Sequence, residues 1–148
     1  MDLDLIGKQV IGVGTDVIEV DRIRKVIERT PSFVERIYTD GEIEYCFSNG
    51  HSDVPARLDP KSQDLSELIL QRLAARFAAK EAVMKALGVG LGAAEFKDIE
   101  VVSSDSGKPE LKISGKAKDL ADSQGISGWL VSLSHSDTVA QAFVAAIG

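Results

Sequence analysis

The most regular pattern in the chain follows a cap-like signal at Asp64–Glu67 and runs to about Leu87, with apolar side chains at helical spacing. Leu70, Phe77 and Met84 fall on one side of a helix drawn with 3.6 residues per turn. Gly88 follows, at a position where left-handed glycines often end helices. The pattern predicts one long helix that ends just before Gly88 and turns an apolar face toward the core.

Before this helix, the pattern predicts a strand and three shorter helices. Residues 10–14 are apolar and contain two glycines, which is typical of a short buried strand. Over residues 17–29 the apolar positions recur at helical spacing, and Pro31 stops that helix and starts a short one. The spacing of Thr39 and Glu42 is that of a capping box, which predicts a further helix.

After the long helix, strand patterns dominate. The pattern predicts a hairpin, a short helix and two final strands: residues 99–103 with 110–113, residues 115–123, and residues 129–133 with 138–147. Residues 48–64 contain glycine and two prolines without any period, which predicts a mobile loop. Helices come early and strands late, so we expect an α+β fold with a small antiparallel sheet packed against the long helix.

Length and charge narrow the class of protein. A chain of 148 residues predicts a single domain over residues 1–148. The formal net charge of −6 argues against a general nucleic-acid binder. Cys46 is the only cysteine, which fits a reducing compartment, and the sequence contains neither a basic signal peptide nor an apolar run of membrane-spanning length. We therefore expect a cytoplasmic protein without a membrane partner.

One carboxylate lies in an unusual place on the long helix. Glu81 falls in the middle of its apolar face, between Phe77 and Met84. An ionised carboxylate in apolar surroundings is costly unless a proton, a cationic side chain or a metal compensates it. Lys85 follows one turn later and Lys80 flanks the other edge. Two interpretations are open: a surface ion pair that the core skirts, or a cleft in which Glu81 holds a cation and the lysines hold an anion.

Magnesium suits the second interpretation, because it takes hard oxygen ligands, often one or two from protein with phosphate oxygens beside them. Asp16 is the best candidate for the second protein ligand, because it follows the strand of residues 10–14. Gly12 and Gly14 in that strand would leave room for a ligand to approach the backbone. The alternative is that Asp16 caps the following helix.

Two segments together carry a resemblance to a known family: I-G-V-G-T-D-V-I-E-V-D-R-I and R-F-A-A-K-E-A-V-M-K-A-L-G. With the later pieces F-K-D-I-E-V, S-G-K-P and V-S-L-S-H-S, the chain resembles the holo-acyl-carrier-protein synthase type of 4′-phosphopantetheinyl transferase. The resemblance implies that family's fold. It also implies transfer of phosphopantetheine from coenzyme A to a serine of an apo acyl carrier protein, with release of adenosine 3′,5′-bisphosphate.

The resemblance also implies roles for particular residues. Asp16 and Glu81 match the magnesium ligands, Lys85 matches a lysine at the transferred phosphate, and Glu81 and Lys85 are the expected catalytic residues. Either Glu81 or a metal-bound water could take the proton of the serine. Five residues fall in segments that surround the coenzyme's adenosine and 3′-phosphate in the family: Arg76, Gly107, Lys108, Pro109 and His135. A homotrimer with coenzyme A between subunits is implied as well.

Basic residues gather in two further places. Arg72, Arg76 and Lys80 follow at four-residue intervals, as either a solvated face or part of a phosphate site. A second group follows Asp16 and could dock an acidic carrier protein, although such charges also serve solubility: Arg22, Arg24, Lys25 and Arg29.

Two other classes of function compete with the transferase. A non-catalytic binding module would be expected to lose at least one of Asp16, Glu81 and Lys85, and all three are present. A metal-dependent phosphohydrolase would need more carboxylates or histidines near the site. The kind of carrier, from fatty-acid, polyketide or peptide synthesis, stays open.

Overall fold

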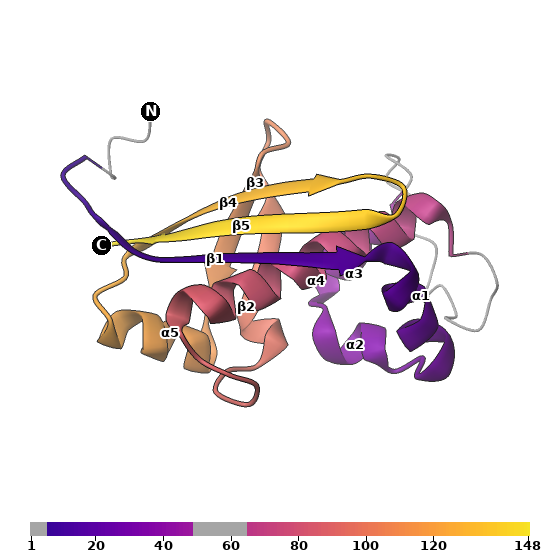
Figure 1. The fold of residues 1–148 in the computed structure, drawn as a ribbon, viewed down its shortest axis with the longest axis horizontal. Coiled ribbons are helices and arrows are strands. Elements are labelled where there is room, and N and C mark those ends of the chain that lie inside the picture. Colours follow the sequence, from indigo (N-terminus) through magenta and orange to yellow (C-terminus); the bar gives the residue numbers. More distant parts are fainter. Residues whose placement is uncertain (1–5, 49–64) are drawn as a thin grey trace.

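The computed structural model describes residues 6–48 and 65–148, and at its centre a three-stranded antiparallel sheet packs on one long helix (Figure 1). The loop expected over residues 48–64 lies, from residue 49 onward, outside the described part. The elements in chain order are β1 (Val10–Glu19), α1 (Val20–Arg29), α2 (Phe33–Ile37), α3 (Asp40–Phe47), α4 (Glu67–Leu87), η2 (Phe96–Asp98), β2 (Ile99–Ser103), β3 (Pro109–Ile113), α5 (Gly115–Ser123), β4 (Gly128–His135) and β5 (Val139–Ile147). The α+β prediction is confirmed.

The large sheet has the strand order β1-β5-β4, and β2 and β3 form a separate hairpin. The hairpin packs with β3 beside β4, and its turn projects past the β4 edge of the large sheet (Figure 1). The predicted hairpin, the helix over residues 115–123 and the two final strands are all present. The capping box of Thr39 and Glu42 at the start of α3 is present as well.

Strand β1 continues past the point where the sequence predicted its end. It pairs with β5 along its whole length to Glu19, and Asp16 lies opposite Ala142 in that ladder. Helix α1 starts only at Val20. The prediction that the strand ends after residue 14 was therefore wrong, and so was the alternative that Asp16 caps a helix. The error arose because β5, more than a hundred residues away, supplies the pairing that extends the strand.

Helix α4 is buried around most of its circumference. The large sheet covers one side, while α1, α3 and β2 contact the others. Its ends are capped by the Ser66 side chain and by Gly88 in a left-handed conformation, with φ of 71°. The burial includes the polar side chains of Gln71, Arg76 and Lys80, so more of the helix is enclosed than the single apolar face predicted. No helix in the described ranges is long and apolar enough to cross a membrane.

Two glycines of β1 face the backbone of α4. A Cβ atom on Gly14 would overlap the carbonyl oxygen of Ala82, and one on Gly12 would overlap the carbonyl oxygen of Ala86. The space beside these glycines is therefore filled by the helix, and the prediction that it admits a ligand was wrong. The close approach presses the inner face of β1, including Asp16, against α4.

The opposite face of the large sheet carries several large apolar side chains that are exposed, with polar residues between them; we call it the apolar face. Alternation along β1 turns Val13 and Val17 outward, and the ladder places Phe143 of β5 and Leu130 of β4 on the same face. Val13, Val17 and Phe143 are 56 %, 60 % and 50 % exposed. A patch of this kind is typical of a surface that another protein covers.

Candidate functional site

Three of the predicted site residues come together where the inner face of β1 meets α4. The Lys85 ammonium lies 3.2 Å from Oδ1 of Asp16 and donates a 2.9 Å hydrogen bond to the carbonyl oxygen of Thr15. Glu81 lies one helical turn before Lys85, near enough for the charge of Asp16 to perturb it. We call Asp16, Glu81 and Lys85 the Asp16 cluster.

The charge balance of this cluster disfavours an ionised Glu81. Partial burial is the largest cause that raises the pKa of Glu81, and the negative charge of Asp16 raises it further. The positive charges of Lys85 and Arg22 act in the opposite direction. A divalent cation between two such carboxylates would relieve their repulsion.

The donor set fits magnesium better than a softer metal. Two carboxylates are hard oxygen ligands, and magnesium commonly takes no more than two from protein. Within residues 6–48 and 65–148, no group of three or more histidine, cysteine, aspartate or glutamate side chains could hold a metal ion. The remaining ligands would therefore be oxygens of a bound phosphate or of water.

The predicted basic stripe along α4 packs against α3. The Arg76 guanidinium lies 4.0 Å above the ring of Tyr45, and its buried Nε finds no hydrogen-bond partner in the described part of the chain. Arg72 donates a 2.8 Å hydrogen bond to the carbonyl oxygen of Ser48 at the end of α3. The alternative of a solvated face is therefore wrong for this stripe.

Lys80 lies on a different side of α4 from the Asp16 cluster. Its ammonium forms a 2.7 Å ion pair with Glu42 of α3, and neither side chain has any exposed surface. The prediction that Lys80 flanks the candidate cleft and holds an anion was wrong. The sequence analysis gave Glu42 only a capping role, and no local pattern links it to Lys80, which lies 38 residues further along the chain. Backbone groups of four residues complete the network: Thr39, Phe96, Ile99 and Val101.

The other residues predicted to bind coenzyme A lie in two exposed turns. Gly107, with φ of 84°, and Lys108 form the β2–β3 turn, and Pro109 begins β3. His135 is the exposed last residue of β4. In the part of the chain that the structure describes, no hydrogen bond or ion pair links either turn to the Asp16 cluster. Of the residues predicted to bind metal or coenzyme, Asp16, Glu81 and Lys85 are those that the structure shows acting on one another within residues 6–48 and 65–148.

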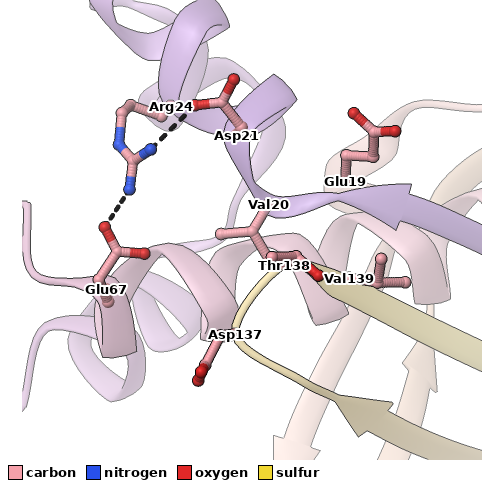
Figure 2. A pocket seen from close by; sticks show the side chains of 8 residues that line it. All are labelled: Glu19, Val20, Asp21, Arg24, Glu67, Asp137, Thr138 and Val139. Atoms are coloured by element: carbon pink, nitrogen blue, oxygen red, sulfur yellow. Dashed lines mark hydrogen bonds and ion pairs between the residues drawn. The ribbon is translucent and has the colours of Figure 1, made fainter.

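A pocket of 380 Å³ lies where α1 and α4 begin beside the β4–β5 turn (Figure 2). Arg24 spans it, with ion pairs to Asp21 at 2.9 Å and to Glu67. Four carboxylates against one guanidinium make the pocket acidic, which does not suit a coenzyme that carries phosphates. The lining residues are Glu19, Val20, Asp21, Arg24, Glu67, Asp137, Thr138 and Val139.

The predicted docking residues on α1 differ in their surroundings. Arg24 is engaged in the acidic pocket, and Lys25 forms a 3.0 Å ion pair with Asp21. Arg22 and Arg29 are exposed and form no ion pair within residues 6–48 and 65–148. Arg22 is also near enough to Glu81 to lower its pKa. Of the four predicted docking residues, Arg22 is the one that the structure shows to act on the Asp16 cluster.

Comparison with known proteins places this site in a family. The model of the 4′-phosphopantetheinyl transferase superfamily matches residues 12–144. The holo-[acyl-carrier-protein] synthase of Ruminiclostridium cellulolyticum is 44 % identical over 133 residues, which cover 88 % of this chain and 87 % of that protein.

Solved structures agree with the sequence match. The holo-ACP-synthase of Plasmodium yoelii has a TM-score of 0.75 and 30 % identity, with 96 % of this chain and 98 % of that chain covered. The Bacillus anthracis synthase, solved in complex with CoA (3′,5′-ADP), has a TM-score of 0.69 and 33 % identity, with 94 % and 97 % covered. These matches span both segments that form the Asp16 cluster, and they show that the chain belongs to the 4′-phosphopantetheinyl transferase superfamily, among its holo-[acyl-carrier-protein] synthases.

Proposed function

We propose that the chain transfers 4′-phosphopantetheine from coenzyme A to a serine of an apo acyl carrier protein in a magnesium-dependent reaction that releases adenosine 3′,5′-bisphosphate. The observation that carries the proposal is the Asp16 cluster itself, in which two carboxylates and a lysine converge from β1 and α4. Further support comes from relatives named holo-[acyl-carrier-protein] synthase and from one such synthase solved with coenzyme A.

The chemistry assigns a role to each member of the cluster. In the reaction, the serine oxygen forms a bond to the phosphorus next to pantetheine, and the bond from that phosphorus to the bisphosphate leaving group breaks. The serine proton would pass to Glu81 or to a water molecule at the site. Asp16 and Glu81 would hold a magnesium ion, which when bound neutralises charge on the diphosphate. Lys85, more than half exposed and 3.2 Å from Asp16, is placed to bind a phosphate oxygen and offset charge on the leaving side.

We propose that the rest of the coenzyme binds across a boundary between subunits of a homotrimer. Arg76 and the turns that carry Gly107, Lys108, Pro109 and His135 make no bond to the Asp16 cluster within the described residues of one copy. The apolar face of the large sheet supports association, because a single copy leaves Val17 and Phe143 largely in water. In such a trimer, we propose that turns of a neighbouring copy reach the site and bind the rest of the coenzyme.

We propose that the chain is one domain, docks its carrier through α1 and acts in the cytoplasm. Packing of α4 against β1 and β5 supports one domain, because these elements come from both ends of the chain. The exposed Arg22 and Arg29 would dock the acidic carrier next to the metal site. Cys46 is a free thiol, which is compatible with the reducing cytoplasm that we propose as the place of reaction.

One assay tests the proposed function against its competitors. The protein is mixed with coenzyme A, magnesium and an apo carrier protein, and the carrier is weighed by mass spectrometry. A gain of one phosphopantetheine group, abolished by a chelator and absent from a carrier whose acceptor serine is alanine, supports the transferase. An unchanged carrier with bound coenzyme A would indicate a binding module. Breakdown of coenzyme A without carrier modification would indicate a phosphohydrolase. Carriers of fatty-acid, polyketide and peptide synthesis, run in parallel, identify the substrate.

A further inference from the structure

Helix α4 carries a fully buried ion pair at the residue before Glu81. The Lys80 ammonium lies 2.7 Å from Oε1 of Glu42, and both side chains are completely enclosed. Taking two charges out of water is costly, and apolar residues of similar volume often stabilise a core as well as such a pair does. We therefore ask how this ion pair affects the position of α4, and not how much it stabilises the core.

The hydrogen bonds of Lys80 fix its position in three directions. A lysine ammonium has three donors, and here each finds an acceptor: the Glu42 carboxylate, the carbonyl oxygen of Phe96 at 3.0 Å and that of Ile99. Glu42 is held in turn, because it accepts hydrogen bonds from the backbone of Thr39 at 3.0 Å and Val101 at 3.1 Å. The network therefore ties α4 to α3, η2 and β2.

The orientation of the Glu81 side chain depends on α4, the helix that also carries Lys80. Successive residues of a helix are about 100° apart around its axis. While Lys80 is held among α3, η2 and β2, Glu81 lies near enough to β1 for the charge of Asp16 to act on it. A rotation or slide of α4 would displace the Glu81 carboxylate by the same movement that strains the hydrogen bonds of Lys80. An apolar side chain at residue 80 would fill the same space without opposing such a movement.

We propose that the Lys80–Glu42 pair is a positioning device that sets the rotation and height of α4, so that the Glu81 carboxylate faces Asp16 across the metal site. The inference rests on the proposed function, because it takes Glu81 as a metal ligand. Lys80 and Glu42 are positioning residues, since both are enclosed and neither lies in the Asp16 cluster. The device predicts that removing both charges affects metal binding and turnover more than stability.

The test is the double variant Glu42→Gln/Lys80→Met, which removes both charges with little change in side-chain length. The glutamine oxygen can still accept a hydrogen bond from one of the two backbone groups that Glu42 satisfies. The matched control is Asp122→Asn/Lys118→Met, which removes a 2.9 Å ion pair on the exposed surface of α5. For each protein we would measure the thermal midpoint, Mn²⁺ affinity with coenzyme A by electron paramagnetic resonance, kcat and the KM for carrier.

If the pair positions Glu81, kcat and metal affinity should change, while KM for carrier and the oligomeric state should not. In Glu42→Gln/Lys80→Met, kcat falls and the Mn²⁺ dissociation constant rises by about tenfold or more, while KM for carrier and the oligomeric state are unchanged. The control variant matches the wild type throughout. If the double variant does not fold, Glu42→Gln alone, which leaves Lys80 its two carbonyl acceptors, is expected to give a smaller loss in the same direction per folded molecule.

Other outcomes overturn the proposal. Wild-type kcat and Mn²⁺ affinity in a folded charge-free variant would mean that the pair does not position Glu81. A crystal structure of that variant gives a readout that does not depend on activity: a Glu81 carboxylate displaced from Asp16 supports the proposal, and an unchanged one contradicts it. If the wild-type protein transfers nothing, the proposed function fails, and this crystal structure still decides whether the pair places Glu81.

Discussion

Gly14 lies so close to the carbonyl oxygen of Ala82 that no side chain fits between β1 and α4 at this point. This contact sets the separation between the strand that carries Asp16 and the helix that carries Glu81. The two acidic residues are far apart in the sequence, and they approach each other because the residue at position 14 has no Cβ.

We expect Gly14→Ala to destabilise the protein and to disturb the site. The added Cβ would overlap the Ala82 carbonyl oxygen and lie 2.9 Å from the backbone nitrogen of Ala86, so β1 and α4 would have to separate. Overpacking of this kind costs about 1–3 kcal/mol, measurable by urea unfolding, and transfer per folded molecule should fall. Gly90→Ala is the matched control, because a Cβ there meets nothing within 4 Å. Equal stability of both variants would contradict the prediction.

Glu81→Gln separates the chemical role of this carboxylate from its structural one. The amide has nearly the same shape but is a poor magnesium ligand, so we expect a folded protein whose magnesium-dependent transfer falls by at least about 100-fold. Initial rates over a magnesium titration measure the effect. Wild-type rates at every magnesium concentration would remove Glu81 from the site.

The same variant makes a prediction about pH. Because burial and Asp16 raise the pKa of Glu81, the folded state binds its proton more tightly than the unfolded state does. Stability of the metal-free wild type should therefore fall as pH rises from the ordinary glutamate pKa of 4.5 through the raised value. Glu81→Gln lacks this titration, so its thermal midpoint should exceed that of the wild type at pH 7.5. The difference should shrink toward pH 4, as melts without metal would show.

Part of this fold could be predicted from the sequence, and part depends on long-range contacts that the sequence does not reveal. Helix α4, the β2–β3 hairpin and the final strands were predictable, because local periodicity, capping residues and turn residues all favour them. The pairing of β1 beyond Thr15 was not predictable, because its partner β5 lies at the other end of the chain.

The candidate site was predictable to a similar extent. Glu81 was predictable as a site residue, because a carboxylate among apolar neighbours needs a compensating partner. The structure places Asp16 and Lys85 near it. Lys80 was misplaced, because the periodicity of α4 does not reveal that α3 supplies Glu42 as a buried partner. The prediction that Gly14 leaves room for a ligand was wrong for a similar reason. The sequence shows that residue 14 has no side chain, but it does not show which part of the protein packs against it.

Docking of the carrier should depend on Arg22. This side chain is exposed on α1 near Glu81, and reversing its charge should repel an acidic carrier. We expect Arg22→Glu to raise KM for carrier about five- to tenfold at low salt, with the difference reduced at high salt. Lys112→Glu, which reverses an exposed charge on β3, serves as the control. An unchanged KM for Arg22→Glu at low salt would show that docking occurs elsewhere.

The apolar face of the large sheet should mediate self-association. Phe143 is half exposed at the middle of this face, and a carboxylate there would be desolvated in any tight contact between copies. We expect Phe143→Glu to convert the proposed trimer to monomers in light scattering and to remove most transfer activity. Leu91→Glu is the control, because Leu91 is 81 % exposed in the loop after α4. A trimeric Phe143→Glu would place the subunit contact on another surface.

The middle strand of the large sheet, β5, is the last one along the chain, and its neighbours are β1 on one side and β4 on the other (Figure 1). During synthesis, β1 leaves the ribosome before the other strands. More than a hundred further residues must be translated before its pairing partner β5 is available. Until residue 147 is free, β1 and α4 expose apolar surface that the finished sheet covers. Folding should therefore be completed only after translation of β5, and a nascent chain stalled before residue 139 should be a target for chaperones.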